Sequence, residues 1–129
     1  MIVTASTPAA PTMQTNPLEE LTQALRRFAA ERDWEQFHTP KNLAMSVLIE
    51  AAEIAEHFQW SDATRNPALP VDKRDAVALE IGDTLLYLLR LADILDIDPI
   101  AAANAKMTIN AKRYPIEKSF GKSAKYNEL

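Results

Sequence analysis

The chain has 129 residues and a mass of 14.4 kDa, and its 47% hydrophobic and 25% charged residues are the balance of one globular domain. A net charge of −4 argues against a duplex nucleic-acid binder, and the lack of cysteine excludes disulfides, zinc–thiolate sites and thiol catalysis. With only two glycines, the sequence has no Gly-rich phosphate loop, so side chains or a metal ion would have to hold any phosphate.

The first 15 residues are small, proline-containing and aperiodic, which predicts a disordered leader without the features of a signal peptide. Three pairs of a capping residue and a proline then mark expected helix starts: Asn16-Pro17, Thr39-Pro40 and Asp98-Pro99. A further helix is expected from Asp72, after a loop that contains Pro67 and Pro70. The pattern predicts an all-α domain over residues 16–115, a four-helix bundle with helices at 17–32, 40–60, 72–95 and 99–112.

The helix predicted over 40–60 carries a carboxylate within its apolar stripe. Glu50 falls in the same narrow arc as Val47 and Ile54 at 100° per residue, and Glu53 lies at the edge of that arc. On the helix predicted over 72–95, Glu80 shares a face with apolar residues and Asp83 flanks it. This second helix is apolar nearly all round, which indicates burial on more than one side, as in an oligomer core. We therefore expect a homodimer or homotetramer.

The two acidic pairs have i,i+3 spacing, so each pair points two carboxylates the same way. Carboxylates on an apolar face are costly unless a cation compensates them, and Mg²⁺ with a phosphate substrate fits this donor set. One alternative is that the acids form interhelical salt bridges in a non-catalytic helical module. Another is a di-iron bundle, but that site requires Glu-x-x-His on two helices, and His57 follows Glu53 by four residues.

Other side chains could bind a nucleotide. Trp34 and Trp60 flank the 40–60 helix, Tyr87 lies one turn beyond Asp83, and the last helix carries a lysine and an amide at i,i+4, Lys106 and Asn110. Aromatic rings can stack on a base and a lysine can contact a phosphate. Each also has a structural interpretation, as a core aromatic or a solvated charge. The basic extended tail, 116–129, is either solvated or a lid over an anionic substrate.

Three segments together resemble a known family: FHTPKNLAMSVLIEAAEIAEHFQW, LEIGDTLLYLLRLAD and KMTINAKRYP. They are similar to the MazG-like all-α nucleoside triphosphate pyrophosphohydrolases, and within that family to the dCTP pyrophosphatase branch. The resemblance covers residues 18–129 and includes the KYNEL ending. Where the family pattern has EExxE, Ile49 replaces the first glutamate, a departure that this branch tolerates.

The resemblance implies a role for each of these residues. Glu50, Glu53, Glu80 and Asp83 would bind Mg²⁺, with Glu50 and Glu53 also catalytic. The substrate contacts would come from Trp34, His38 and Trp60 around the base, Tyr87 near the sugar or phosphates, and Lys106 and Asn110. The implied reaction is Mg²⁺-dependent hydrolysis of dCTP or a modified dCTP to dCMP and pyrophosphate, a nucleotide-pool cleansing activity. Independently of the resemblance, the lack of a signal-peptide pattern and of an apolar run of membrane-span length predicts a cytoplasmic protein without membrane partners, and the net charge predicts no nucleic-acid partner. The same fold acting on dUTP or a deaminated purine nucleotide is the alternative.

Overall fold

In this computed structural model, residues 16–61 and 69–129 are described, so the predicted leader and most of the Pro67 loop lie outside the described residues. All regular secondary structure in the described part of the chain is helical, and no strand occurs there. Its main elements are α1 (Pro17–Glu31), α2 (Pro40–Glu56), α3 (Val71–Ile94) and α4 (Pro99–Arg113), with shorter turns η1 (Glu35–Phe37), α5 (Ile116–Ser119) and η2 (Tyr126–Glu128). The all-α prediction is confirmed. None of the helices is long and apolar enough to cross a membrane, over the same described residues.

The three predicted capping pairs each begin a helix. The side-chain oxygen of Asn16 accepts a hydrogen bond from the Leu18 backbone N–H at 3.1 Å, and Thr39 Oγ1 accepts one from Asn42 at 3.2 Å. Asp98 Oδ1 accepts from two backbone N–H groups at the start of α4, at 2.9 and 3.0 Å. These oxygens satisfy N–H groups that have no partner within a helix.

Two predicted segments differ from the structure. The second helix was expected to reach residue 60, but α2 ends at Glu56 because the chain tightens there into turns, with Phe58 N–H donating to Ala55. The tail was expected to be extended, yet after Pro115 it forms the single helical turn α5, and later η2. Proline at the start of a turn costs no hydrogen bond, which permits this short helix.

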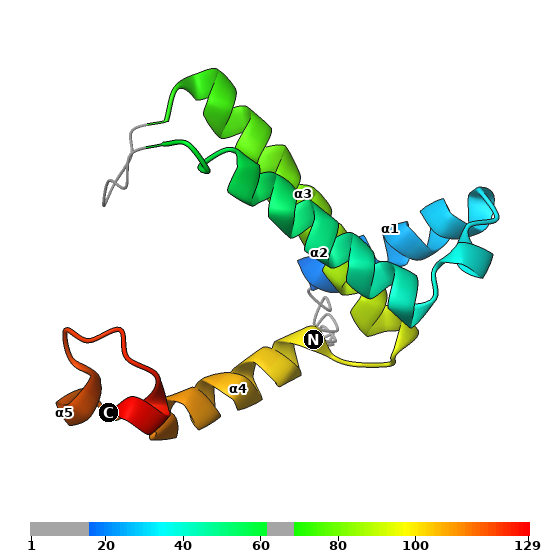
Figure 1. Cartoon of the computed structure of the whole chain (residues 1–129). Coiled ribbons are helices and arrows are strands. Elements are labelled where there is room, and N and C mark those ends of the chain that lie inside the picture. Colours follow the sequence, from blue (N-terminus) through cyan, green and yellow to red (C-terminus); the bar gives the residue numbers. More distant parts are fainter. Residues whose placement is uncertain (1–15, 62–68) are drawn as a thin grey trace, which may run out of the picture.

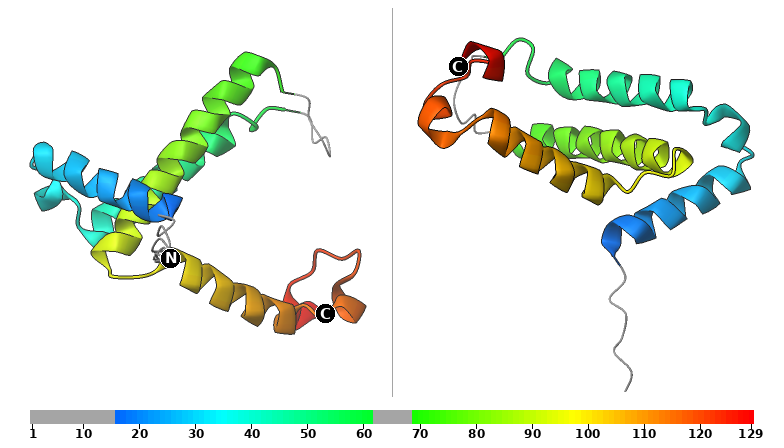
Figure 2. Two further views of the ribbon diagram at one scale, coloured as in Figure 1. Left: turned by 180° about the vertical axis from the view of Figure 1, so that it is seen from behind. Right: turned by 90° about the horizontal axis from the view of Figure 1, so that it is seen from below.

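α2 and α3 run side by side as an antiparallel hairpin, and α1 crosses α3 near its carboxyl end (Figure 1). The buried apolar side chains come from these three helices: Ala29 from α1, Leu43 from α2, and Val77 and Leu89 from α3. Figure 2 shows the same pairing from two further directions. The core therefore fixes the relative position of α2 and α3, the two helices that carry the acidic pairs.

α4 projects away from this core and carries α5 and the carboxyl terminus at its far end (Figure 1). None of its residues is buried, and even its large apolar side chains are exposed, Met107 at 68% and Ile109 at 44%. A 15-residue helix is marginal in water when no other element covers its apolar side. α4, the fourth of the predicted helices, therefore lies outside the core that α1, α2 and α3 form within a single chain.

Candidate functional site

The α2–α3 hairpin brings the acidic residues of both pairs together. Glu50 from α2 and Glu80 and Asp83 from α3 each offer a carboxylate oxygen, and these oxygens all lie within 4.8 Å of one another. Glu50 and Glu80 are partly buried, whereas Asp83 is exposed. Two oxygens bound to one Mg²⁺ are at most about 4.2 Å apart, so small side-chain rotations would let these three residues hold a divalent cation.

The pKa directions show the electrostatic cost of this cluster. Burial, followed by the negative charges of Glu53, Asp83 and Glu80, raises the pKa of Glu50. A hydrogen bond with Glu53 is the main cause that raises the pKa of Glu80, and burial and the nearby acids add to it. His57 opposes this second shift because its Nε2 lies 3.9 Å from Glu80 Oε1. Glu53 thus belongs to the same cluster, which a bound cation would neutralise.

An aromatic cavity of about 250 Å³ adjoins the acidic cluster. Trp34, His38 and Tyr87 line it together with Asp83, so one carboxylate is shared by the cluster and the cavity. A neighbouring hollow of about 340 Å³ is lined by the same three side chains and by Asn42 and Ser46. Trp34 makes edge-to-face contacts, with ring centroids 5.7 Å from Phe28 and 6.4 Å from His38.

A tight turn after α1 directs Trp34 toward this cavity. Asp33 has a φ of 54°, in the left-handed region that aspartate tolerates better than most residues. The Trp34 N–H then donates to the Ala29 carbonyl at 2.9 Å, and the Gln36 amide donates to the Asp33 carboxylate at 2.8 Å. These contacts hold η1 and Trp34 against the end of α1.

Three of the predicted substrate residues lie elsewhere. Trp60 is 90% exposed, beyond the end of α2 and next to the part of the chain that is not described. Lys106 and Asn110 lie on α4, and no residue of α4 lines the two aromatic cavities. The structure therefore assembles Trp34, His38 and Tyr87 beside the acids, but not these three.

Sequence reasoning missed Phe28 and Arg90. Both line the aromatic cavity, and Arg90 is only 4% exposed. A lone arginine within the apolar run LLYLLRLAD was an available signal, because charged side chains are seldom fully buried without partners. Phe28 gave no comparable signal, since an aromatic residue on an amphipathic helix is ordinary core composition.

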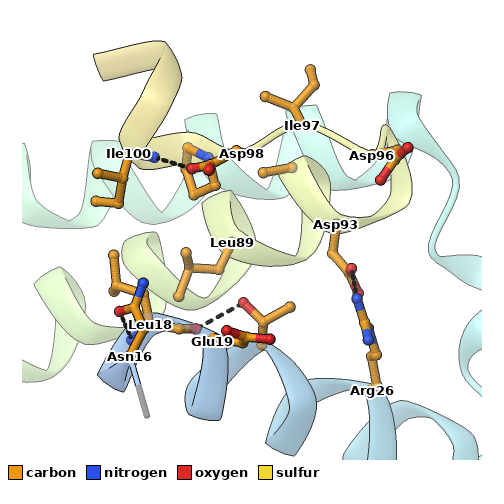
Figure 3. A pocket seen from close by; sticks show the side chains of 13 residues that line it. Asn16, Leu18, Glu19, Arg26, Leu89, Asp93, Asp96, Ile97, Asp98 and Ile100 are labelled. Atoms are coloured by element: carbon orange, nitrogen blue, oxygen red, sulfur yellow. Dashed lines mark hydrogen bonds and ion pairs between the residues drawn. The ribbon is translucent and has the colours of Figure 1, made fainter. Parts of the chain in front are cut away.

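A third cavity, of about 310 Å³, lies between the start of α1, the end of α3 and the start of α4 (Figure 3). Asp93, Asp96 and Asp98 contribute to its lining, and Arg26 reaches across from α1 to Asp93. None of the predicted site residues lines this cavity. It is therefore separate from the acidic cluster and the aromatic cavities.

Comparisons with known proteins agree on one family. The model of the MazG-like family matches residues 45–129. Two curated relatives are dCTP pyrophosphatase 1 of Mus musculus, 44% identical over 114 residues, and dCTP pyrophosphatase 1 of Homo sapiens, 42% identical over 114 residues. Each alignment covers 87% of this chain and 67% of the relative. A crystal structure of a pyrophosphatase from Archaeoglobus fulgidus superposes with a TM-score of 0.70 at 41% identity, covering 82% of this chain and 99% of that one.

Proposed function

The chain belongs to the MazG-like family, and from that premise we propose that it is a Mg²⁺-dependent pyrophosphohydrolase that converts dCTP, or a modified dCTP, to dCMP and pyrophosphate. The observation that carries the proposal is the position of Asp83. This residue belongs both to a carboxylate cluster of the size that a divalent cation needs and to an aromatic cavity that could take a base. Such a junction suits a substrate with a base at one end and phosphates at the other.

Glu50, Glu80 and Asp83 would hold Mg²⁺, with Glu53 as a fourth carboxylate in reach of Glu80. When bound, the ion supplies charge neutralisation and polarisation of the phosphates. Glu53 is the best placed of the four to orient or deprotonate a water, because it interacts with both Glu50 and Glu80. That water attacks the α-phosphorus, the bond to the bridging oxygen breaks, and pyrophosphate leaves.

The base would lie in the cavity lined by Trp34, His38 and Tyr87. An aromatic lining stacks on any base, so the alternative substrates dUTP and deaminated purine nucleotides share this chemistry. The substrate named for the mouse and human relatives favours dCTP over these alternatives. The pyrophosphatase names also favour an enzyme over a helical interaction module. We further propose a cytoplasmic location.

We also propose that the enzyme acts as a homodimer or homotetramer. Large apolar side chains are exposed on α2 and α3, including Leu48 at 70% and Leu79 at 73%, and α4 packs against neither helix. A second copy would cover these surfaces and could bring its own α4 to the acidic cluster. Lys106 and Asn110 would then contact the phosphates of a substrate bound to the neighbouring copy.

Hydrolysis in ¹⁸O-labelled water tests the reaction. Attack at the α-phosphorus places the label in the nucleoside monophosphate and leaves pyrophosphate unlabelled, which mass spectrometry of the two products distinguishes. Label in pyrophosphate, or release of inorganic phosphate, would contradict the proposed bond cleavage. A panel of deoxynucleoside triphosphates in the same assay tests the substrate, with dCTP or a 5-modified dCTP expected to react fastest.

A further inference from the structure

A chain of polar contacts runs from the surface to His38. Arg90 is buried on α3, and its Nε donates a hydrogen bond to His38 Nδ1 at 3.0 Å. Its Nη1 donates to Asp93 Oδ2 at 3.3 Å, and Asp93 also accepts from Arg26 Nε at 2.8 Å (Figure 3). The guanidinium of Arg90 is therefore held at both ends, by a carboxylate on one side and an imidazole on the other.

The contact between Arg90 and His38 fixes where the imidazole proton lies. A guanidinium has only donors, so a hydrogen bond from Arg90 Nε requires an unprotonated Nδ1 with its lone pair facing the arginine. The ring proton is then on Nε2. Burial and the charge of Arg90 lower the pKa of His38, partly opposed by Glu35, which disfavours the doubly protonated ring that would break this contact.

His38 lines both aromatic cavities, alongside Trp34 and Tyr87. Among the described residues its only side-chain hydrogen bond is the one through Nδ1. The protonated Nε2 is thus a donor that no described side chain accepts, in cavities whose lining also includes the polar side chains of Asp83, Asn42 and Ser46. A cytosine base offers two acceptors on its pairing edge, O2 and N3.

We propose that Arg90, itself held by Asp93 and Arg26, is a positioning residue that fixes His38 as the neutral Nε2–H tautomer, so that the ring donates one hydrogen bond to an acceptor atom of the nucleotide base. The identity of the ligand rests on the proposed function. The locked tautomer does not, because it follows from contacts within the chain. Arg90 itself need not touch the substrate.

Nuclear magnetic resonance of the full chain, with ¹⁵N-labelled arginine and histidine, tests the lock directly. The sequence contains only two histidines, so the spectrum of His38→Gln assigns both rings. At neutral pH and without ligand we expect a through-hydrogen-bond coupling between Arg90 Nε and His38 Nδ1, and a proton on Nε2. A protonated Nδ1, or no coupling together with the chemical shift of an unbonded Nδ1, would overturn the proposal.

A double-mutant cycle with Arg90→Lys and His38→Gln tests the consequence for the substrate. Lysine keeps the charge beside Asp93 but lacks the fork that reaches both partners. Arg90→Lys should raise KM for dCTP by roughly three- to tenfold, the size of one lost hydrogen bond, and leave kcat within about twofold. In the His38→Gln background the same change should alter KM by less than about twofold. An equal loss in both backgrounds would show that Arg90 acts independently of His38 and would overturn the proposal.

A matched pair of exposed arginines covers the case in which Arg90→Lys fails to fold. Arg26→Met removes the outer support of Asp93 and should weaken the coupling between Arg90 and His38, whereas Arg27→Met, one residue along α1, should leave it unchanged. Equal couplings in both variants would remove Arg26 from the proposal. If no nucleotide reacts at all, the proposed function fails, while the resonance measurement still decides the tautomer.

Discussion

Asp83 is the residue at which the two halves of the site meet. It stands within 4.8 Å of carboxylate oxygens from Glu50 and Glu80, and it also lines the cavity that contains Trp34 and Tyr87. Burial raises the pKa of Glu50, a hydrogen bond with Glu53 raises that of Glu80, and the neighbouring acids add to both shifts, so ionisation of the cluster is disfavoured without a cation. A cluster that is unfavourable alone and favourable with a cation is what a metal-dependent phosphate enzyme requires.

Binding of Mg²⁺ should therefore stabilise the fold through Asp83. We expect added Mg²⁺ to raise the melting temperature of the wild type, by an amount that corresponds to about 2.7 kcal/mol at 100 times its Kd. Asp83→Asn should abolish this response. Asp75→Asn, the same change at an exposed position of α3, should preserve it. Differential scanning fluorimetry decides, and equal responses of the two variants would refute the metal site.

Asp93 should make stability depend on acidic pH. The hydrogen bond from Arg26 is the main cause that lowers the pKa of Asp93 below its usual value of 3.8. As the pH falls through that usual value, the Asp93 carboxylate takes up a proton in the unfolded chain before it does so in the folded chain. The stability that the ion pair contributes is therefore fully present above the usual value and is lost as the pH falls through the lower folded-state pKa.

Urea unfolding between about pH 5 and pH 3 measures this slope. Arg26→Met should flatten the slope because the folded-state pKa then moves back toward its ordinary value. Arg27→Met should retain the wild-type slope. A steeper slope in Arg26→Met would mean that this ion pair does not cause the shift.

The sequence predicted the acids better than it predicted their surroundings. Glu50 and Glu80 could be found because each interrupts a helical apolar stripe, a local signal. The contact between His38 and Arg90 joins residues 52 positions apart, and no local pattern encodes such a pairing. It depends on how η1 folds back over α3, which packing decides.

At the level of helices, the starts were more predictable than the ends. The start of α2 is set by one side chain, since Thr39 Oγ1 accepts from Asn42 and Pro40 follows it. Its end has no such side-chain signal. Backbone turns follow Glu56, where α2 ends. The apolar pattern continues to Trp60, and a prediction based on that pattern therefore made the helix too long.

Loss of the cap of α2 should destabilise the protein by about 1 kcal/mol. Thr39→Ala removes the hydroxyl that accepts the Asn42 N–H, whereas Thr39→Ser keeps it. We expect the serine variant to lie within a few tenths of a kcal/mol of the wild type, because serine caps as well as threonine. Urea denaturation followed by circular dichroism measures both, and equal losses would assign the effect to the threonine methyl group instead.

For the whole molecule, the position of α4 is the feature that one chain does not explain. The helix is capped by Asp98 and well formed, yet no residue of it is buried. The sequence indicated four helices but could not say whether the fourth packs within its own chain, because apolar periodicity identifies a face and not the surface that covers it. The same holds for the exposed apolar side chains of α2 and α3, whose pattern does not say which surface covers them.

Mixing two inactive variants tests whether α4 serves a neighbouring copy. Lys106→Ala and Asp83→Asn should each be inactive alone, since one removes a phosphate contact and the other a metal ligand. Mixed and allowed to exchange subunits, they should recover roughly a quarter of wild-type activity in a dimer, because half of the randomly paired dimers contain one intact site.

A mixture of Lys106→Ala with an unrelated Lys112→Ala variant gives the reference, since Lys112 is not assigned to the site. The activity of this reference mixture should come from dimers of two Lys112→Ala subunits and from the sites that a Lys112→Ala subunit completes in mixed dimers. No recovery in the first mixture, despite subunit exchange, would place Lys106 at the site of its own chain.

Pyrophosphate release from dCTP, measured with and without Mg²⁺ for wild type, Asp83→Asn and Asp75→Asn, decides whether Asp83 belongs to a metal-dependent active site. We expect Mg²⁺-dependent release by the wild type and by Asp75→Asn, and at least about a hundredfold less by Asp83→Asn, as when charge stabilisation of the transition state is lost. Release by Asp83→Asn at the wild-type rate, or no Mg²⁺-dependent release by any of the three proteins, would contradict this expectation.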